Sequence, residues 1–130
     1  MPRTLDGMSI PVDIGELRDA LADRGPGYLL TSSADGRVKA VTVEPIFRDG
    51  VLRCEASKGS TANLRANPRA TFLFPPLEPR GYTLLVDGAA TSDDTGIEFS
   101  PQSAILHRPA SHADAPTGGD GCDNDCAPLV

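Results

Sequence analysis

The sequence has no tryptophan, and its other aromatic residues, cysteines and histidines are few. Its 130 residues include four Phe, two Tyr, three Cys and two His. Three unevenly spaced cysteines are typical of a protein from a reducing compartment and exclude a disulfide framework as the basis of the fold. A complete four-ligand zinc set is not evident either. A chain of this length can bury a core of its own, and it is expected to form a single domain without such supports.

The chain also lacks a transmembrane-length apolar run, and no signal peptide with a basic and then an apolar segment opens it. These features predict a cytoplasmic enzyme or binding protein. There is no phosphate-binding Walker loop, dinucleotide glycine fingerprint or zinc-protease motif, and no Ser/His/Asp set can be argued. Any redox chemistry is therefore expected to come from a bound cofactor, and no side chain is predicted as catalytic.

The charge of the chain is negative but uneven. The net charge is −6, which argues against nucleic acid as a partner because phosphate backbones require basic stripes. Residues 111–130 contain four Asp and no Lys or Arg, whereas residues 47–69 contain five basic and two acidic side chains. The positive segment is thus the natural place to look for a small anionic ligand.

The apolar pattern predicts one helix followed by about six short strands. Residues 1–12 are expected to be a loose arm, and an amphipathic helix from Ile14 is expected to be capped by Asp13 and to end at Gly25. Asp-Gly turns then separate runs of period two, with Pro45 as the sign of an edge or a bulge and Pro101 as the sign of an interruption. The strands are expected at 27–33, 38–47, 51–57, 69–74, 82–92 and 96–109. This spacing predicts an antiparallel barrel or sandwich over residues 13–110, followed by a Gly- and Asp-rich tail over 111–130.

Within the positive segment, the stretch SKGSTANLRANPRATFLF at residues 57–74 combines a helix signal with basic and hydroxyl side chains. Ser57 or Ser60 can cap a short helix that Pro68 prevents from continuing. The N-terminus of a helix holds phosphate well, and Lys58 and Thr61 can add a charge and a hydrogen bond. The alternative is a capped connector helix with solvated charges.

Two segments carry a resemblance to a known family: DGVLRCEASKGSTANLRANPRATFLFPP and YTLLVDGAA. They resemble the pyridoxamine 5′-phosphate oxidase-like split-barrel family, and the resemblance covers roughly residues 14–108. The resemblance implies a mainly β fold, a six-stranded antiparallel split β-barrel of Greek-key type with an N-terminal helix and a short connector helix. It also implies a homodimer that holds FMN or the deazaflavin coenzyme at the subunit interface, with haem as a less common ligand. Hydride transfer to or from a small organic substrate is the implied activity.

The resemblance also assigns candidate cofactor-binding residues. The ring would lie along the second strand, from Val41 to Pro45. The residues it assigns to the ring are Val41, Thr42 and Val43, and those it assigns to the phosphate are Arg53, Lys58, Ser60, Thr61 and Asn63. Many FMN-binding members carry an Arg-Lys pair before the helix, where this chain has Ser60-Thr61. That departure favours the deazaflavin coenzyme, or no flavin.

Two other functions compete with this oxidoreductase. One is a non-catalytic protein of the same fold that holds flavin, deazaflavin or haem. The other is a cofactor-free dimer in which the thiols of the tail are active, because Cys122 and Cys126 lie among aspartates. These two cysteines are weak candidates for a soft-metal site or a small disulfide ring, and a mobile tail with incidental thiols is the simpler interpretation.

Overall fold

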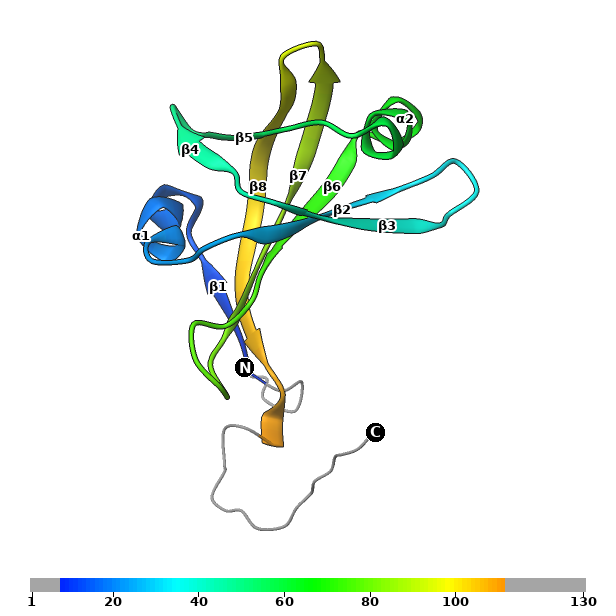
Figure 1. The fold of residues 1–130 in the computed structure, drawn as a ribbon. Helices are drawn as coiled ribbons and strands as arrows, with labels where there is room; N and C mark the ends of the chain where they lie inside the picture. Colours follow the sequence, from blue (N-terminus) through cyan, green and yellow to red (C-terminus); the bar gives the residue numbers. More distant parts are fainter. Residues whose placement is uncertain (1–7, 112–130) are drawn as a thin grey trace.

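The computed structural model describes residues 8–111, which form one curled antiparallel sheet and two short α-helices (Figure 1). Local signals explain most of the boundaries: Asp-Gly turns separate the strands, and Ser57 and Pro68 enclose the longer helix. The elements in chain order are β1 (Met8–Val12), the 3₁₀-helix η2 (Ile14–Glu16), α1 (Leu17–Leu21), β2 (Gly27–Ser32), β3 (Val38–Val43), β4 (Ile46–Arg48), β5 (Val51–Cys54), α2 (Lys58–Ala66), β6 (Arg69–Phe74), β7 (Thr83–Asp93) and β8 (Gly96–Arg108).

The strands follow the order β3-β2-β6-β7-β8-β5-β4, and β1 pairs with β8. The neighbours β2 and β6, and likewise β5 and β8, are distant in the sequence, as expected for a Greek-key arrangement. The two ends of the strand order, β3 and β4, are joined by residues 44 and 45 alone, so the sheet curls until its ends meet through this short link (Figure 1). The predicted mainly β split barrel is therefore confirmed. Over residues 8–111 it has eight strands rather than six, and the additional ones are β1 and β4.

The N-terminal region departs from the prediction in two respects. Residues 8–12, which were expected in a loose arm, are paired with β8 from Met8↔Arg108 to Val12↔Ala104. The expected helix from Ile14 is a 3₁₀ turn followed by a short α-helix, and the Asp13 side chain makes no capping hydrogen bond. The helix ends before Gly25, because Asp23 itself takes the left-handed conformation with φ of 70°.

Pro45 has the local effect that its position suggested, whereas Pro101 does not. Pro45 divides the long strand expected over 38–47, so that β3 and β4 are separate edge strands at opposite ends of the sheet order. Pro101 does not interrupt β8. A shift in the β7–β8 register between Asp87 and Gly88 lies opposite it, so the irregularity is a bulge within one continuous strand.

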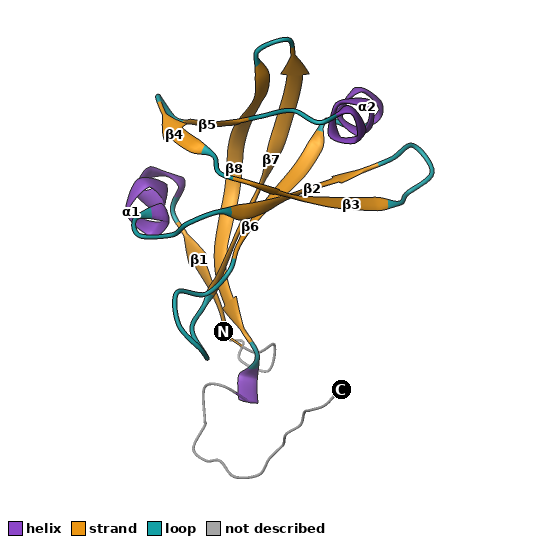
Figure 2. Cartoon of the chain, viewed as in Figure 1, coloured by secondary structure: helices purple, strands orange, loops and turns teal. Residues whose placement is uncertain are grey.

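The core lies inside the curl of the sheet and is closed by one residue from each helix. Leu17 of α1 is 0% exposed, and Leu64 of α2 is 5% exposed. At the centre, the ring of Phe72 meets that of Phe99 edge-to-face with centroids 4.8 Å apart. Figure 2 shows the two helices at separate margins of the sheet, so each covers a different opening of the half-barrel.

The predictions about membrane segments and about the C-terminal tail are the last to compare with the structure. Within the described residues, no helix is long and apolar enough to span a membrane. Cys122 and Cys126 lie outside the described residues, as does the tail from His112 onward, and the cytoplasmic location likewise stays a prediction.

Candidate functional site

The capped start of α2 forms the corner where the sequence placed an anion. Ser57 has extended backbone angles, and its Oγ accepts a hydrogen bond of 3.1 Å from the backbone N–H of Ser60. The helix then runs to Ala66, and Pro68 follows its C-cap residue Asn67. Of the two predicted caps, Ser57 is therefore the one used, and the first turn of α2 carries the partial positive charge of a helix N-terminus.

Three of the predicted phosphate ligands form side-chain hydrogen bonds within the protein. Ser60 is 0% exposed, and its Oγ accepts a hydrogen bond of 3.0 Å from the Ser57 hydroxyl. The hydroxyls of Thr61 and Ser92 lie 2.8 Å apart, and the Asn63 amide donates a 3.0 Å bond to Thr31 Oγ1. These contacts bind α2 to β7 and β2. The side chains thus hold the helix in place rather than point toward a ligand.

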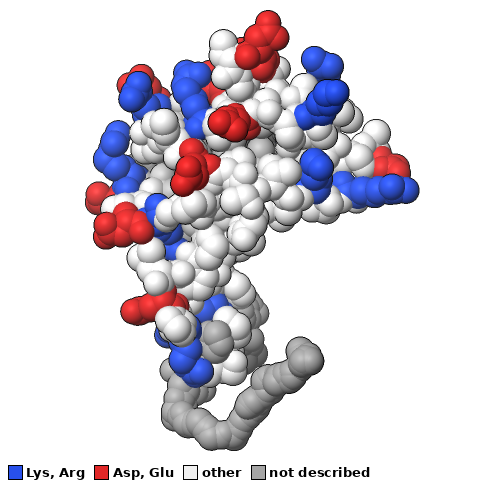
Figure 3. Space-filling view, in the orientation of Figure 1, with Lys and Arg blue, Asp and Glu red and all other residues white. Residues whose placement is uncertain are grey.

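Two lysines lie at the same corner, and one of them was not predicted. Lys58 is exposed at the first position of α2. Lys39 of β3 lies across Gly59: a Cβ on that glycine would meet Lys39 Cε at 2.5 Å and Nζ at 3.0 Å. Neither lysine forms an ion pair within the described residues. Figure 3 shows basic side chains around α2 and along the β2–β3 hairpin, on one side of the molecule. A usable signal for Lys39 was its even spacing from Val41 and Val43 on the strand assigned to the ring.

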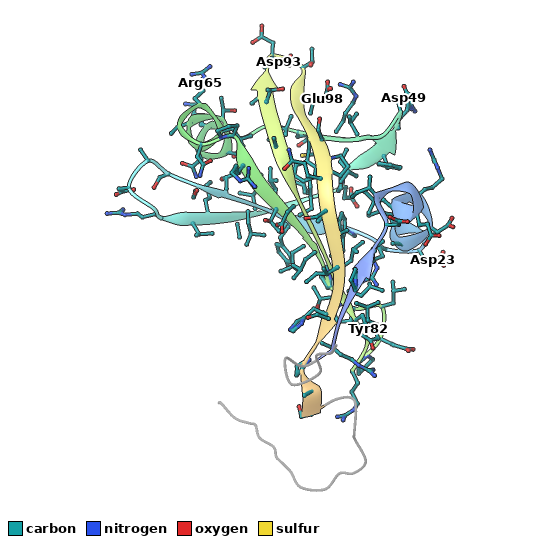
Figure 4. The ribbon with its side chains drawn as sticks, turned by 180° about the vertical axis from the view of Figure 1, so that it is seen from behind. Asp23, Asp49, Arg65, Tyr82, Asp93 and Glu98 are labelled. Atoms are coloured by element: carbon teal, nitrogen blue, oxygen red, sulfur yellow. The ribbon has the colours of Figure 1, made fainter. Side chains whose placement is uncertain are left out.

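Arg53, the remaining predicted phosphate ligand, is paired elsewhere. Its neighbour Leu52 points into the core, so Arg53 points outward, where its Nη1 lies 3.0 Å from Glu98 Oε1 on β8. Both side chains are about half exposed. Figure 4 shows Glu98 and Asp93 near the turn of the β7–β8 hairpin. The hydrogen bonds that Asp93 accepts from Thr95 lower the pKa of its carboxyl.

The predicted ring-binding strand is β3, which lies at one end of the sheet order. Val41 and Val43 are half-buried against the core, whereas Thr42 is exposed. Among the described strands β3 pairs with β2 alone, so its other edge presents backbone groups without a strand partner. Such an edge suits backbone contacts to the rim of a planar ring. The structure thus brings β3, Lys39 and Lys58 to one corner and leaves Arg53 out of it.

A hollow of about 560 Å³ opens on the outer face of the sheet, and none of the predicted cofactor-binding residues lines it. Arg69 and Asp87 give its wall both signs of charge, and Thr71 donates a hydrogen bond of 2.5 Å to Asp87. The strand registers place an apolar row beside it on the same face. That row consists of Tyr28, Leu73, Leu85 and Ile105.

Two curated mycobacterial proteins are similar to the chain in sequence. They are the uncharacterized proteins Mb0449c of Mycobacterium bovis and MT0457 of Mycobacterium tuberculosis. Each is 36% identical over 132 residues, and the alignment covers 88% of this chain and 92% of the relative. No family model matches the chain.

Solved structures share the fold at low sequence identity. The conserved hypothetical protein Rv2991 of M. tuberculosis aligns with a TM-score of 0.60 and 16% identity, over 94% of this chain and 98% of its own. An FAD-binding protein from Mycobacterium smegmatis aligns with a TM-score of 0.57 and 15% identity, over 78% of this chain and all of its own.

Proposed function

We propose that the chain, which belongs to the family of the mycobacterial proteins Mb0449c and MT0457, is a flavin- or deazaflavin-dependent oxidoreductase that works as a homodimer. The observation that carries this proposal is the corner where Lys39 and Lys58 flank the N-terminus of α2 beside the open edge of β3. The similarity of the fold to an FAD-binding protein supports the same ligand class.

The corner offers what a phosphate-bearing ring cofactor requires. The free N–H groups of the first turn of α2, together with two ammonium groups, favour a phosphate, and the backbone of β3 can contact the ring edge. When bound, a flavin or deazaflavin supplies the hydride chemistry. The role of this chain is to hold the phosphate, orient the ring and exclude water beside the half-buried Val41 and Val43.

The donor set favours a modest phosphate site and therefore the deazaflavin coenzyme over tightly bound FMN. Lysines act as point charges, whereas an arginine can hold a phosphate through two parallel hydrogen bonds. Arg53 is paired with Glu98, and the hydroxyls of Ser60 and Thr61 are engaged within the protein. Haem is the less common ligand among the proteins that the sequence resembles, and it remains the less favoured alternative.

The outer face of the sheet is the surface we assign to the homodimer. Tyr28 is 40% exposed there, in the apolar row that crosses β2, β6, β7 and β8. An exposed apolar row of this kind is typical of an interaction surface. Pairing two such faces would cover it and place a second chain against the 560 Å³ hollow.

The test is a fluorescence titration of the purified protein with FMN, FAD and the deazaflavin coenzyme. One of them should bind, and Lys39→Ala and Lys58→Ala should each weaken that binding about tenfold, because each removes a charged contact to phosphate. Arg48→Ala is the matched control, since Arg48 is exposed on β4 outside the corner. Binding of a cofactor without turnover of its reduced form would favour the non-catalytic carrier. A colourless protein that binds none of them would contradict the proposal.

A further inference from the structure

A second cavity lies on another part of the molecule, between α1 and the β4–β5 hairpin. Its volume is about 220 Å³, below the roughly 300 Å³ at which sites for drug-sized ligands begin. Figure 1 shows α1 and β4 on the same side of the sheet. The apolar part of the wall comes from Leu21, Pro45, Phe47, Leu52 and Phe74.

The floor of this cavity belongs to the core and is rigid. Leu52 and Phe74 are 1% and 2% exposed. Arg24 fixes the wall, because its guanidinium donates hydrogen bonds to the backbone oxygens of Ala20, Pro75 and Tyr82 at 3.0 to 3.2 Å. All of these acceptors are neutral carbonyls, and burial lowers the pKa of Arg24. The floor of the cavity is therefore formed by packed strands, and Arg24 holds the loop that follows α1 against them.

Arg18 gives the cavity its charge. Its guanidinium carbon lies 5.2 Å from the centroid of the Phe47 ring, in a cation–π contact. Among the described residues it has no carboxylate within ion-pair distance. A guanidinium held against an aromatic face keeps the N–H groups on its edge available, and their spacing matches the two oxygens of a carboxylate.

We infer that this cavity binds a small apolar monocarboxylate of the size of benzoate, with its body against Leu21, Pro45 and Phe47 and its carboxylate on Arg18. The charge of Arg18, the apolar wall and the small volume together select this class of ligand. The inference does not depend on the cofactor. If the proposed function holds, Pro45 both lines this cavity and ends the stretch assigned to the ring, so the ligand would be a substrate beside the ring.

Gly25 allows a test that adds a bulky side chain at the wall of the cavity without a clash. A Cβ on Gly25, which lines the cavity, would meet no atom within 4 Å, so Gly25→Leu can be accommodated. Gly15→Leu is the matched control, because Gly15 has the same free space and does not line the cavity. Arg18→Gln removes the one of the two guanidinium charges in the wall that is not bonded to backbone carbonyls, and Arg48→Gln removes an equal charge from the outward side of β4.

The experiment is a titration of the cofactor-free protein with benzoate and with benzyl alcohol, followed by backbone amide chemical shifts. Saturable benzoate shifts are expected around α1 and β4, with binding weakened about tenfold or more in Arg18→Gln and abolished in Gly25→Leu. Both controls should bind like the unmodified protein, and benzyl alcohol should bind about tenfold more weakly. Equal shifts with both compounds, or benzoate binding that survives Gly25→Leu, would overturn the inference whatever the cofactor titration shows.

Discussion

The side-chain amide of Asn63 donates a hydrogen bond of 3.0 Å to the hydroxyl of Thr31, and this contact joins α2 to β2. Thr31 is 2% exposed, so water cannot replace the donor if it is removed. Asn63→Ala is expected to lower the free energy of unfolding by about 1–3 kcal/mol, the cost of a buried polar group without a partner. Urea unfolding measures this loss. Arg65→Ala, at an exposed position of the same helix, should change stability by less than about 0.5 kcal/mol.

Gly59→Ala separates the stability of α2 from the function proposed for its N-terminus. Alanine favours a helix over glycine by about 1 kcal/mol, and the atoms that the new Cβ would meet are the flexible end of Lys39. We expect a protein of equal or greater stability that binds the phosphate-bearing cofactor more weakly, because Lys39 is displaced. Thermal unfolding and cofactor fluorescence measure the two effects. Unchanged affinity would show that Lys39 has no part in the site.

Cys54 is expected to be an unreactive thiol. Burial, followed by the charge of Glu55, raises its pKa from 9.0 to about 11. At pH 8 the folded protein then holds about a hundredth of the thiolate of the unfolded chain. Alkylation by iodoacetamide should therefore be about 100-fold slower in buffer than in urea. The measurement is made in a protein with Cys122→Ser and Cys126→Ser, so that Cys54 is the remaining thiol. Equal alkylation rates in buffer and in urea would contradict the burial of the Cys54 thiol.

The same thiol makes stability depend on alkaline pH. Because the pKa is higher in the folded state, this contribution to the free energy of unfolding is complete below pH 9 and is lost as pH rises toward 11. Cys54→Ala should remove this part of the decline in the free energy of unfolding between pH 9 and pH 11. Urea unfolding of the unmodified protein and of Cys54→Ala across this range measures the difference.

The dimer proposal predicts a difference between two exposed apolar residues. Tyr28→Glu places a charge within the apolar row of the outer face and should give a monomer by light scattering, since burying an unpaired charge is costly. Ile46→Glu is the matched change on β4, where Ile46 is 60% exposed. It should leave the dimer intact. A monomeric unmodified protein at working concentration would refute the assignment of this face.

The parts of the fold that could be predicted are those with local causes. Ser57 and Pro68 enclose α2, and the Asp-Gly pairs mark turns, because capping and positive φ are properties of a few adjacent residues. Pairing of β1 with β8 could not be predicted, since no local signal near Ile10 indicates a partner almost a hundred residues away.

In the candidate site, too, the features with local causes could be predicted and the contacts between distant residues could not. The sequence predicted the short helix α2 and its cap, but the residue types there do not reveal where each side chain points. The resemblance assigned Thr61 and Asn63 to a phosphate, whereas in the folded chain they bind Ser92 and Thr31. Lys39 joins the corner through tertiary packing across Gly59. Its even spacing from Val41 and Val43 indicates which face of the strand it shares with them, but not that Gly59 lies against that face.

The pairings of β8 have a consequence for the way the protein is made. This strand is the last of the described strands, yet β1, β5 and β7 all hydrogen-bond to it. Residues 96–108 must therefore be synthesised before the sheet can close. Until then the backbone groups at the edges of the earlier strands have no strand partner. Folding is expected to be completed only after β8 has been made, and its rate to be set by the long loops that β8 closes with β1 and β5.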